Sequence, residues 1–282
     1  MAAITAALIK QVREETGAGM MDVKKALTEA EGDVARAKEI IRAKGIQAAG
    51  KREGRKAQEG TIASQVVESA NGQTGYAVEL NSETDFVAKT PKFVEFADSV
   101  LEDAVKAEAA SVDEVLAAAS GEATVKEAVE EAAALFGEHV KVGQFAKVEG
   151  PHVEIYAHKK SAEMPPSIVA MIATDEPALL WLTKPLCRFP QWVPVADPRG
   201  RSGRCVESER RVATEKSLAE GKPEKIVPKI VEGRLNAFYK ENVLLEQSYV
   251  KDPSKTVGDL FKEVGGAAVA FARVEVGKGE AE

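Results

Sequence analysis

The first part of the chain carries apolar side chains at helical spacing. Leu8, Ile9 and Val12 share one face of a helix that stops before the glycines at positions 17 and 19. Two further amphipathic runs follow, with apolar positions Met21, Val23, Ala26 and Leu27 and then Val34, Ala37, Ile40 and Ile41. Gly45 fits the position after the last helical residue, so we predict a three-helix bundle over residues 1–45.

The next segment, residues 46–59, loses the apolar face. It is basic, polar and interrupted by glycines, a composition typical of a solvated linker. We therefore predict that this segment connects the bundle to the rest of the chain, with helix over part of its length at most.

Beyond the linker the pattern changes to strands. Residues 61–67 and 76–80 are β-type runs separated by turn residues, which predicts a hairpin. Thr90, followed by a proline, fits the N-cap of a helix, and the Ala- and Glu-rich residues 106–136 predict further helices. We assign these elements to a first core half, residues 60–138.

A second group of strands follows. Residues 140–148 and 153–157 predict another hairpin, and residues 168–173 predict a further apolar strand. Residues 207–248 return to helical character around a Gly-Lys-Pro turn, which indicates an antiparallel helical hairpin. An alternating strand at residues 269–276 closes the chain.

The recurrence of strands followed by helices indicates an internal repeat. We therefore expect an α+β protein whose second core half, residues 139–282, resembles the first in its order of elements. The repeat rests on this order and not on sequence identity.

Charge and composition narrow the function classes. The 45 acidic and 38 basic residues give a net charge of −7, which argues against a sequence-independent grip on nucleic acid. No apolar run reaches the ~18 residues of a membrane span. The N-terminus lacks the apolar core and cleavage site of a signal peptide. With two cysteines, we expect a cytoplasmic protein with reduced thiols that binds neither nucleic acid nor membrane.

The sequence offers little catalytic chemistry. His139, His152 and His158 lack the spacing of a metal site. Phosphate-loop, dinucleotide-binding and nucleophile-elbow motifs are not found in it. A cysteine–histidine pair that uses Cys187 or Cys205 is conceivable, but an isolated cysteine is usually inert. We therefore predict that the protein is not an enzyme and uses neither a metal nor a cofactor.

The stretch 12–27 presents two adjacent methionines after a glycine-rich loop. Successive residues on a helix point ~100° apart, so Met20 and Met21 cannot both be buried in so small a core. An exposed methionine beside the basic Arg13 and Lys24 suits an adaptable protein-binding patch. Partial burial of both methionines is the alternative.

A second stretch, residues 79–89, joins a strand to a helix through a loop, where functional residues concentrate. Thr84 or Asp85 can cap a short helical turn. Phe86 either folds inward against the next helix or projects as a rigid aromatic wedge beside an acid. Packing alone favours the inward position.

Together these two stretches resemble the signature regions of the elongation factor Ts family, the guanine-nucleotide exchange factors of elongation factor Tu. Residues 229–238 and 252–260 resemble the C-terminal region of the family. Val23 stands where the family often has cysteine. The resemblance implies an N-terminal ubiquitin-associated-like three-helix bundle. It also implies a core of two related α+β halves with antiparallel sheet, and a helical hairpin that projects from the second half.

The resemblance also implies a mechanism. The family inserts a Thr-Asp-Phe-Val element into the GTPase domain of elongation factor Tu, where it disturbs the Mg²⁺ ligands and the phosphate cradle so that GDP leaves. The matching residues here are Thr84, Asp85, Phe86 and Val87. Arg13, Met20 and Met21 would grip the same domain, and His158 falls near a family position that faces another domain of the partner. Phe86 is then expected to point outward.

The expected partner is therefore elongation factor Tu, in its GDP-bound and nucleotide-free forms. The alternative function is that of a ubiquitin-associated-like scaffold with no exchange activity. Replacing Asp85 and Phe86 by alanine discriminates the two, because a scaffold would keep its function.

One segment, residues 177–205, departs from the family pattern of an Ala-rich amphipathic helix. It holds both tryptophans, both cysteines and five of the twelve prolines, and a helix cannot run through so many prolines. Codons can be chosen so that a neighbouring reading frame gives a family-like, helix-capping sequence. We therefore hypothesise a compensated frameshift, which resequencing of the gene would test.

Overall fold

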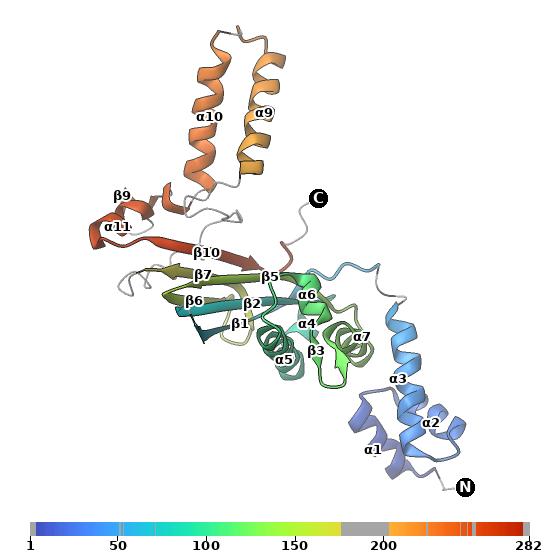
Figure 1. Cartoon of the computed structure of the whole chain (residues 1–282). Helices are drawn as coiled ribbons and strands as arrows, with labels where there is room; N and C mark the ends of the chain where they lie inside the picture. Colours follow the sequence, from blue (N-terminus) through green and yellow to red (C-terminus); the bar gives the residue numbers. More distant parts are fainter. Residues whose placement is uncertain are drawn as a thin grey trace.

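The computed structural model describes residues 4–50, 52, 54–70, 72–175, 203–223, 225–242, 244–246, 248–249 and 252–278. The molecule is elongated. A helical bundle lies at one end, a helical hairpin lies at the other, and two antiparallel sheets with their helices lie between them (Figure 1). The predicted α+β class is confirmed.

The N-terminal bundle contains α1 (Ala6–Thr16), α2 (Met20–Glu29) and α3 (Val34–Gly50). Val12, Val23 and Leu27 are fully buried at its centre, as the amphipathic pattern predicts. The prediction that Gly45 ends the third helix was wrong, because α3 continues to Gly50. Gly45 instead permits close packing: a Cβ there would lie 2.7 Å from the Cβ of Ala134 on a core helix.

The first sheet has the strand order β1-β2-β5. Its strands are β1 (Glu59–Ser69), β2 (Gly72–Ser82) and β5 (Lys141–Gly150). Between β2 and β5 lie α4 (Asp85–Ala88), α5 (Pro91–Lys106), α6 (Val112–Ala117), the short hairpin β3 (Ala119–Ser120) and β4 (Ala123–Thr124), and α7 (Val125–Phe136). Thr90 caps α5 with proline at its first turn, as predicted.

The second sheet has the strand order β10-β7-β6. Its strands are β6 (His152–Lys159), β7 (Pro166–Thr174) and β10 (Ala268–Glu275). The described elements between β7 and β10 are α9 (Gly203–Ala219), α10 (Val227–Asn242), the 3₁₀ turn η2 (Leu244–Glu246), β8 (Ser248–Tyr249), β9 (Asp252–Thr256) and α11 (Val257–Val264).

The predicted hairpin between residues 140–148 and 153–157 was wrong, because β5 pairs with β2 and β6 pairs with β7. Gly150 and Pro151 carry the chain from one sheet to the other. A Cβ at Gly150 would lie 2.8 Å from the Cβ of Ala173, so the crossing needs a residue without a side chain. A proline just beyond fits, because it cannot donate a hydrogen bond to a continuing ladder.

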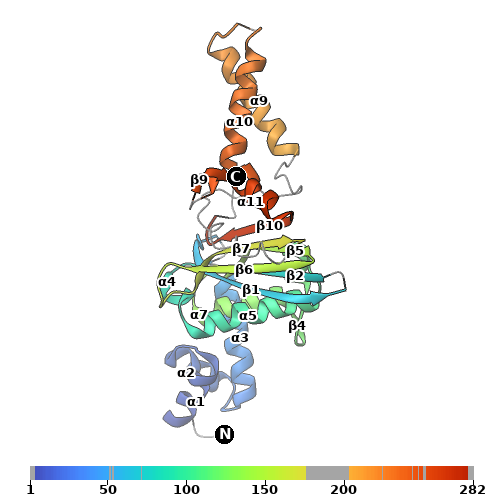
Figure 2. The ribbon, with the colours of Figure 1, turned by 90° about the vertical axis from the view of Figure 1, so that its left-hand side faces the viewer.

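The two sheets pack face to face, and helices cover each outer face (Figure 2). On β2, Tyr76 and Val78 share a cluster with α5 and α7, whereas Ala77 faces the second sheet. On β7, Met171 faces the first sheet and Ile172 faces α11. This alternation follows from the opposite directions of successive side chains along a strand.

One buried carboxylate joins the sheets. Glu79 on β2 is 1% exposed, and its Oε1 accepts hydrogen bonds from Asn81 Nδ2 and from Gly277 N, each 2.7 Å long. Its Oε2 accepts from the backbone N (3.0 Å) and from Nε2 (2.9 Å) of Gln144. Gln144 lies at an irregularity of the β2–β5 ladder. Four hydrogen-bond donors therefore satisfy the buried carboxyl group of Glu79.

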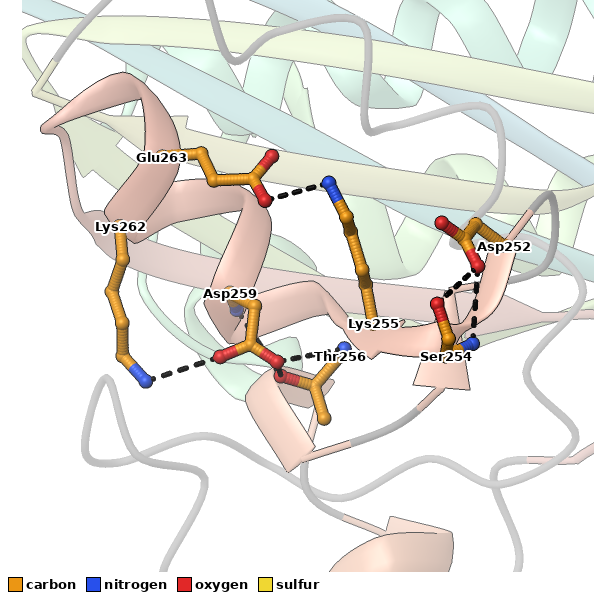
Figure 3. Close-up of polar contacts among 7 residues, drawn as sticks. All are labelled: Asp252, Ser254, Lys255, Thr256, Asp259, Lys262 and Glu263. Atoms are coloured by element: carbon orange, nitrogen blue, oxygen red, sulfur yellow. Dashed lines mark hydrogen bonds and ion pairs between the residues drawn. The ribbon is translucent and has the colours of Figure 1, made fainter.

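The two sheets close in the same way. In each, a short hairpin leads to a threonine that caps the last helix, Thr124 for α7 and Thr256 for α11. Both caps are complete capping boxes with an acid three residues on, and both helices end at a left-handed glycine. Figure 3 shows the second box, where Asp259 accepts from the backbone and hydroxyl of Thr256.

The helical hairpin α9–α10 projects from the second sheet (Figure 1). Its two helices pack against each other through four buried side chains: Ala213, Val227, Val231 and Leu235. The predicted hairpin reaches residue 248, whereas α10 ends at Asn242 and a 3₁₀ turn and a strand follow. Most of the segment 177–205 lies outside the described residues. The frameshift hypothesis concerns this segment, so it also falls outside them. Within the part of the chain that the structure describes, no helix combines the length and apolarity of a membrane span.

Candidate functional site

The loop at the end of β2 forms a single helical turn, α4. Thr84 is its N-cap in an extended conformation, and the Thr84 hydroxyl accepts a 3.4 Å hydrogen bond from the backbone of Val87. The preceding Ser82 is buried, and its hydroxyl donates to the carbonyl of Thr84 (3.0 Å). The turn is therefore tied to the strand before it.

A carboxylate from a distant part of the chain clamps this turn. Glu138 follows α7 and accepts two hydrogen bonds from Thr84, one from the backbone N–H (3.0 Å) and one from the hydroxyl (2.5 Å). The neighbouring residues are joined in the opposite direction: Glu83 accepts a hydrogen bond from the backbone N–H of His139 (2.7 Å). Glu83 also forms an ion pair with Arg55 (3.3 Å). The hydrogen bond from His139, with Arg55 contributing, lowers the pKa of Glu83.

The clamped turn exposes Phe86. Its side chain is 70% exposed, the largest exposed fraction among the large apolar residues of the described chain. Val87 packs against the core and Ala88 is buried, so the turn is held from its other side. The Lys89 ammonium lies 4.4 Å from the centre of the Phe86 ring, a cation–π contact. The inward position that packing alone favours was wrong.

The bundle exposes a second apolar group. Met20 and Met21 occupy the first positions of α2 and are 55% and 64% exposed. Arg13, in the last turn of α1, is also exposed. The geometric prediction was that at least one methionine is exposed, and both are. Val23 is fully buried, so it holds the helix to the bundle while the methionines point away.

A cleft of about 940 Å³ lies between the bundle and the helices α5 and α7. Its wall combines apolar side chains with an excess of cations. The charged residues that line it are Asp22, Lys25, Lys38, Arg42, Lys44, Arg52, Lys92 and Glu131. In Figure 2, α2 and α4 lie toward the same edge of the molecule. The exposed methionines and Phe86 therefore belong to elements on one side of the fold.

Comparison with known proteins decides the family. The family model described as "Elongation factor TS" matches residues 83–278, which include the α4 turn. An elongation factor Ts from Bifidobacterium adolescentis is 81% identical over 100% of both chains. One from Bifidobacterium animalis subsp. lactis is 79% identical over 99% of this chain and 98% of its own. One from Beutenbergia cavernae is 46% identical over 98% of this chain and 100% of its own.

The chain belongs to the elongation factor Ts family. The family model begins at residue 83, so the bundle lies outside its match, whereas the full-length relatives cover the bundle as well. The full-length elongation factor Ts relatives therefore match the regions of both exposed groups, the one on the bundle and the one on α4.

His158 lies apart from these two groups. It is partly buried on β6, an edge strand of the second sheet, beside the ring of Tyr156 at a centroid distance of 6.2 Å. The structure thus places His158 on the second sheet and Phe86 on the turn that follows β2 of the first sheet.

Sequence reasoning missed three residues of the site in this family member: Glu138, Arg55 and Lys89. Glu138 lies 54 positions from Thr84, and only the pairing of β5 with β2 brings it near. Lys89 carried a usable signal, because it follows Phe86 at helical spacing. Among the described residues, no group of three or more His, Cys, Asp and Glu side chains is arranged to hold a metal ion.

Proposed function

We propose that this chain is a guanine-nucleotide exchange factor that binds elongation factor Tu·GDP and promotes GDP release without making or breaking a bond. Membership of the elongation factor Ts family supports the partner. The observation that carries the proposal is the exposed Phe86 on a turn clamped by Glu138. Translation elongation takes place in the cytoplasm, where we propose that the protein acts.

The clamp matters because docking a flexible side chain costs conformational entropy, on the order of 0.5–1.5 kcal/mol for each ordered side chain. Thr84 and Val87 hold the turn in place before the partner arrives, so Phe86 acts as a rigid apolar wedge. Asp85 stands beside it as a polar lever. GDP is held in the partner by a phosphate loop and Mg²⁺. Displacing the elements that carry the Mg²⁺ ligands weakens this hold.

The bundle supplies the grip. Met20 and Met21 are adaptable apolar contacts, and Arg13 adds a charge at their edge. His158 and the second sheet would contact another domain of the same partner, together with the projecting hairpin. Two separate contact regions let the factor hold the partner while the wedge disturbs the nucleotide site.

The exchange activity follows from linkage. A protein that binds the nucleotide-free partner more tightly than the GDP-bound partner must weaken GDP binding by the same factor. No catalytic group is needed, and the net charge of −7 agrees with a protein partner better than with RNA.

The test is the release of a fluorescent GDP analogue from elongation factor Tu. We expect the wild-type chain to accelerate release. The double variant Asp85→Ala with Phe86→Ala should lose the acceleration by at least about tenfold, because it removes wedge and lever together. Val269→Ala is the matched control, since it trims another exposed apolar side chain on β10.

If the wild-type chain binds the partner but leaves GDP release unchanged, the exchange function is wrong and the scaffold alternative is favoured. If the double variant accelerates release as well as the wild type, the wedge assignment is wrong even though the function stands.

A further inference from the structure

Helix α7 touches both parts of the proposed contact surface. At its C-terminal end, Gly137 adopts a left-handed conformation and turns the chain so that Glu138 meets Thr84. The two hydrogen bonds of Glu138 reach the backbone and the hydroxyl of the same threonine, so they fix the direction of the turn as well as its position.

The middle of the same helix contacts the N-terminal bundle. Arg42 of α3 forms an ion pair with Glu131, and Arg52 donates to the carbonyl of Ala133 (3.4 Å). Gly45 sits so close to Ala134 that a side chain would not fit between the helices. Helix α7 is therefore the part of the core on which α3 docks.

The loop that leads to the methionines also meets α7. A Cβ at Gly17 would lie 2.5 Å from Cδ1 of Leu135, and Gly17 has a φ of 68° that few other residues adopt. Met20 begins the helix three positions later. One rigid helix thus sets the distance between the exposed methionines and the clamped turn.

The internal repeat provides a control within the molecule. Glu83 accepts from His139 N, and at the equivalent place Asp175 accepts from Ala267 N (2.5 Å). This tie is common to both sheets, so it belongs to the fold. The residue that matches Glu138 is Gly266, which follows the capping glycine of α11 and has no side chain. Among the described residues, the clamp that Glu138 forms on Thr84 therefore has no counterpart at Gly266.

We propose that Glu138 is a positioning residue for nucleotide exchange: it orients the turn that bears Phe86 relative to the bundle docked on α7. This inference rests on the proposed exchange function and adds a residue to it. Glu138 acts through Thr84 and need not touch the partner. Its loss should leave the grip of the bundle intact and slow the step in which the wedge is inserted.

The experiment measures GDP release from elongation factor Tu over a range of factor concentrations. Glu138→Ala should lower the maximal rate about tenfold, because a misdirected wedge loses most of its effect. The half-saturating concentration should change by less than about threefold, because the methionines still bind. Glu138→Gln keeps one acceptor oxygen and should fall between the wild type and Glu138→Ala.

Two control variants lie on the same helix. Glu130→Ala removes an exposed carboxylate of α7 and should behave as the wild type. Glu127→Ala breaks the capping box at the other end of α7. This variant therefore measures how far a loss of helix stability by itself lowers the maximal rate of GDP release. If Glu127→Ala lowers the maximal rate as much as Glu138→Ala at the same fall in melting temperature, a positioning role for Glu138 is wrong.

A double-variant cycle with Phe86 separates position from stability. When Glu138 acts only by orienting Phe86, the variant with both replaced by alanine is no slower than Phe86→Ala alone. Additive losses would contradict the proposal. If the wild-type chain itself does not accelerate release, the exchange function fails, and the Glu138 inference fails with it for that separate reason.

A third variant tests the bundle side of α7. Gly45→Val should push α3 away from Ala134 and raise the half-saturating concentration, with a smaller effect on the maximal rate. The opposite pattern for Gly45→Val and Glu138→Ala is expected if α7 holds two separable contacts. The same pattern for both variants would contradict the proposal.

Discussion

The two sheets of this protein share one plan and differ in what they present. Each has a β-hairpin, a helical excursion that ends in a capped helix, and a final strand that pairs with the second strand of the hairpin. In the first sheet, the segment between the hairpin and the final strand forms helices that pack against the sheet and the turn that bears Phe86. The second projects the hairpin α9–α10 away from the core (Figure 1).

This difference separates fold from function. Contacts that recur in both sheets, such as the capping boxes and the tie from Glu83 or Asp175, maintain the common architecture. Contacts that the described part of the chain shows in one sheet only, such as the clamp from Glu138, are candidates for a task of that sheet. The repeat thus selects candidate functional contacts without reference to any other protein.

The largest expected effect comes from the two helical layers. Phe93 of α5 is fully buried and meets the ring of Phe136 edge-on, in a larger cluster than that of Phe261 on α11. Both alanine variants should lose about 3–5 kcal/mol of unfolding free energy, Phe93→Ala the more. Urea denaturation measures this. A larger loss for Phe261→Ala would contradict the comparison of the two layers.

The buried Glu79 tests whether the sheets unfold as one unit. The equivalent position on β7 is Met171, which faces the same interface without charge. Glu79→Gln turns an amide N–H₂ toward a donor and should cost about 2–3 kcal/mol. We expect one cooperative transition at a lower denaturant midpoint. Two separate transitions would mean that the sheets are independent and that Glu79 does not join them.

The two capping boxes give a smaller, matched effect. Thr124→Ala and Thr256→Ala each remove an N-cap and should cost about 1 kcal/mol. Near-equal values in denaturation experiments would support the structural equivalence of α7 and α11. A negligible loss at Thr256 would show that α11 depends on packing alone.

The smallest effect concerns acid pH. The hydrogen bonds from Thr256 and then the side chain of Lys262 lower the pKa of Asp259 from 3.8 to about 2. A carboxylate whose pKa falls on folding stabilises α11 above its unfolded pKa, and that contribution is lost as pH falls through the folded value. It should therefore disappear between about pH 4 and pH 2.

Carboxyl ¹³C shifts followed by NMR check this value. The Asp259 midpoint should move up toward 3.8 in Thr256→Ala, because the main cause of the shift is removed. In the first box the pKa of Glu127 is lowered by Thr124 in the same way. A Glu127 midpoint that does not respond to Thr124→Ala would weaken the equivalence of the two boxes.

The order of elements could be predicted because it rests on local patterns. Amphipathic spacing, the Thr90-Pro91 start and the β1–β2 turn each depend on residues close in sequence. The pairing of β5 could not, since the turn at Gly150 and Pro151 looks the same for a hairpin and for a crossing between sheets. Gly45 misled for a similar reason, because a glycine can serve a helix end or a close contact equally well.

The exposed residues of the candidate site could be predicted from the sequence, but the residues that hold them in place could not. The Thr84–Val87 element and the two methionines were found through family resemblance and helix geometry. The clamp was invisible, because a lone glutamate after a glycine carries no signal until the fold places Glu138 beside Thr84. Local packing rules placed Phe86 inward, whereas Val87 and Ala88 of the same turn are the residues that pack toward the core.

The proposed exchange function requires that the chain bind the nucleotide-free form of elongation factor Tu more tightly than the GDP-bound form. Calorimetric titration of the chain into nucleotide-free and into GDP-bound elongation factor Tu measures this directly. We predict tighter binding to the nucleotide-free form, by the same factor by which the chain weakens GDP binding. Equal affinity for the two forms would rule out the proposed exchange function, because a protein that binds both states equally does not shift the equilibrium between them.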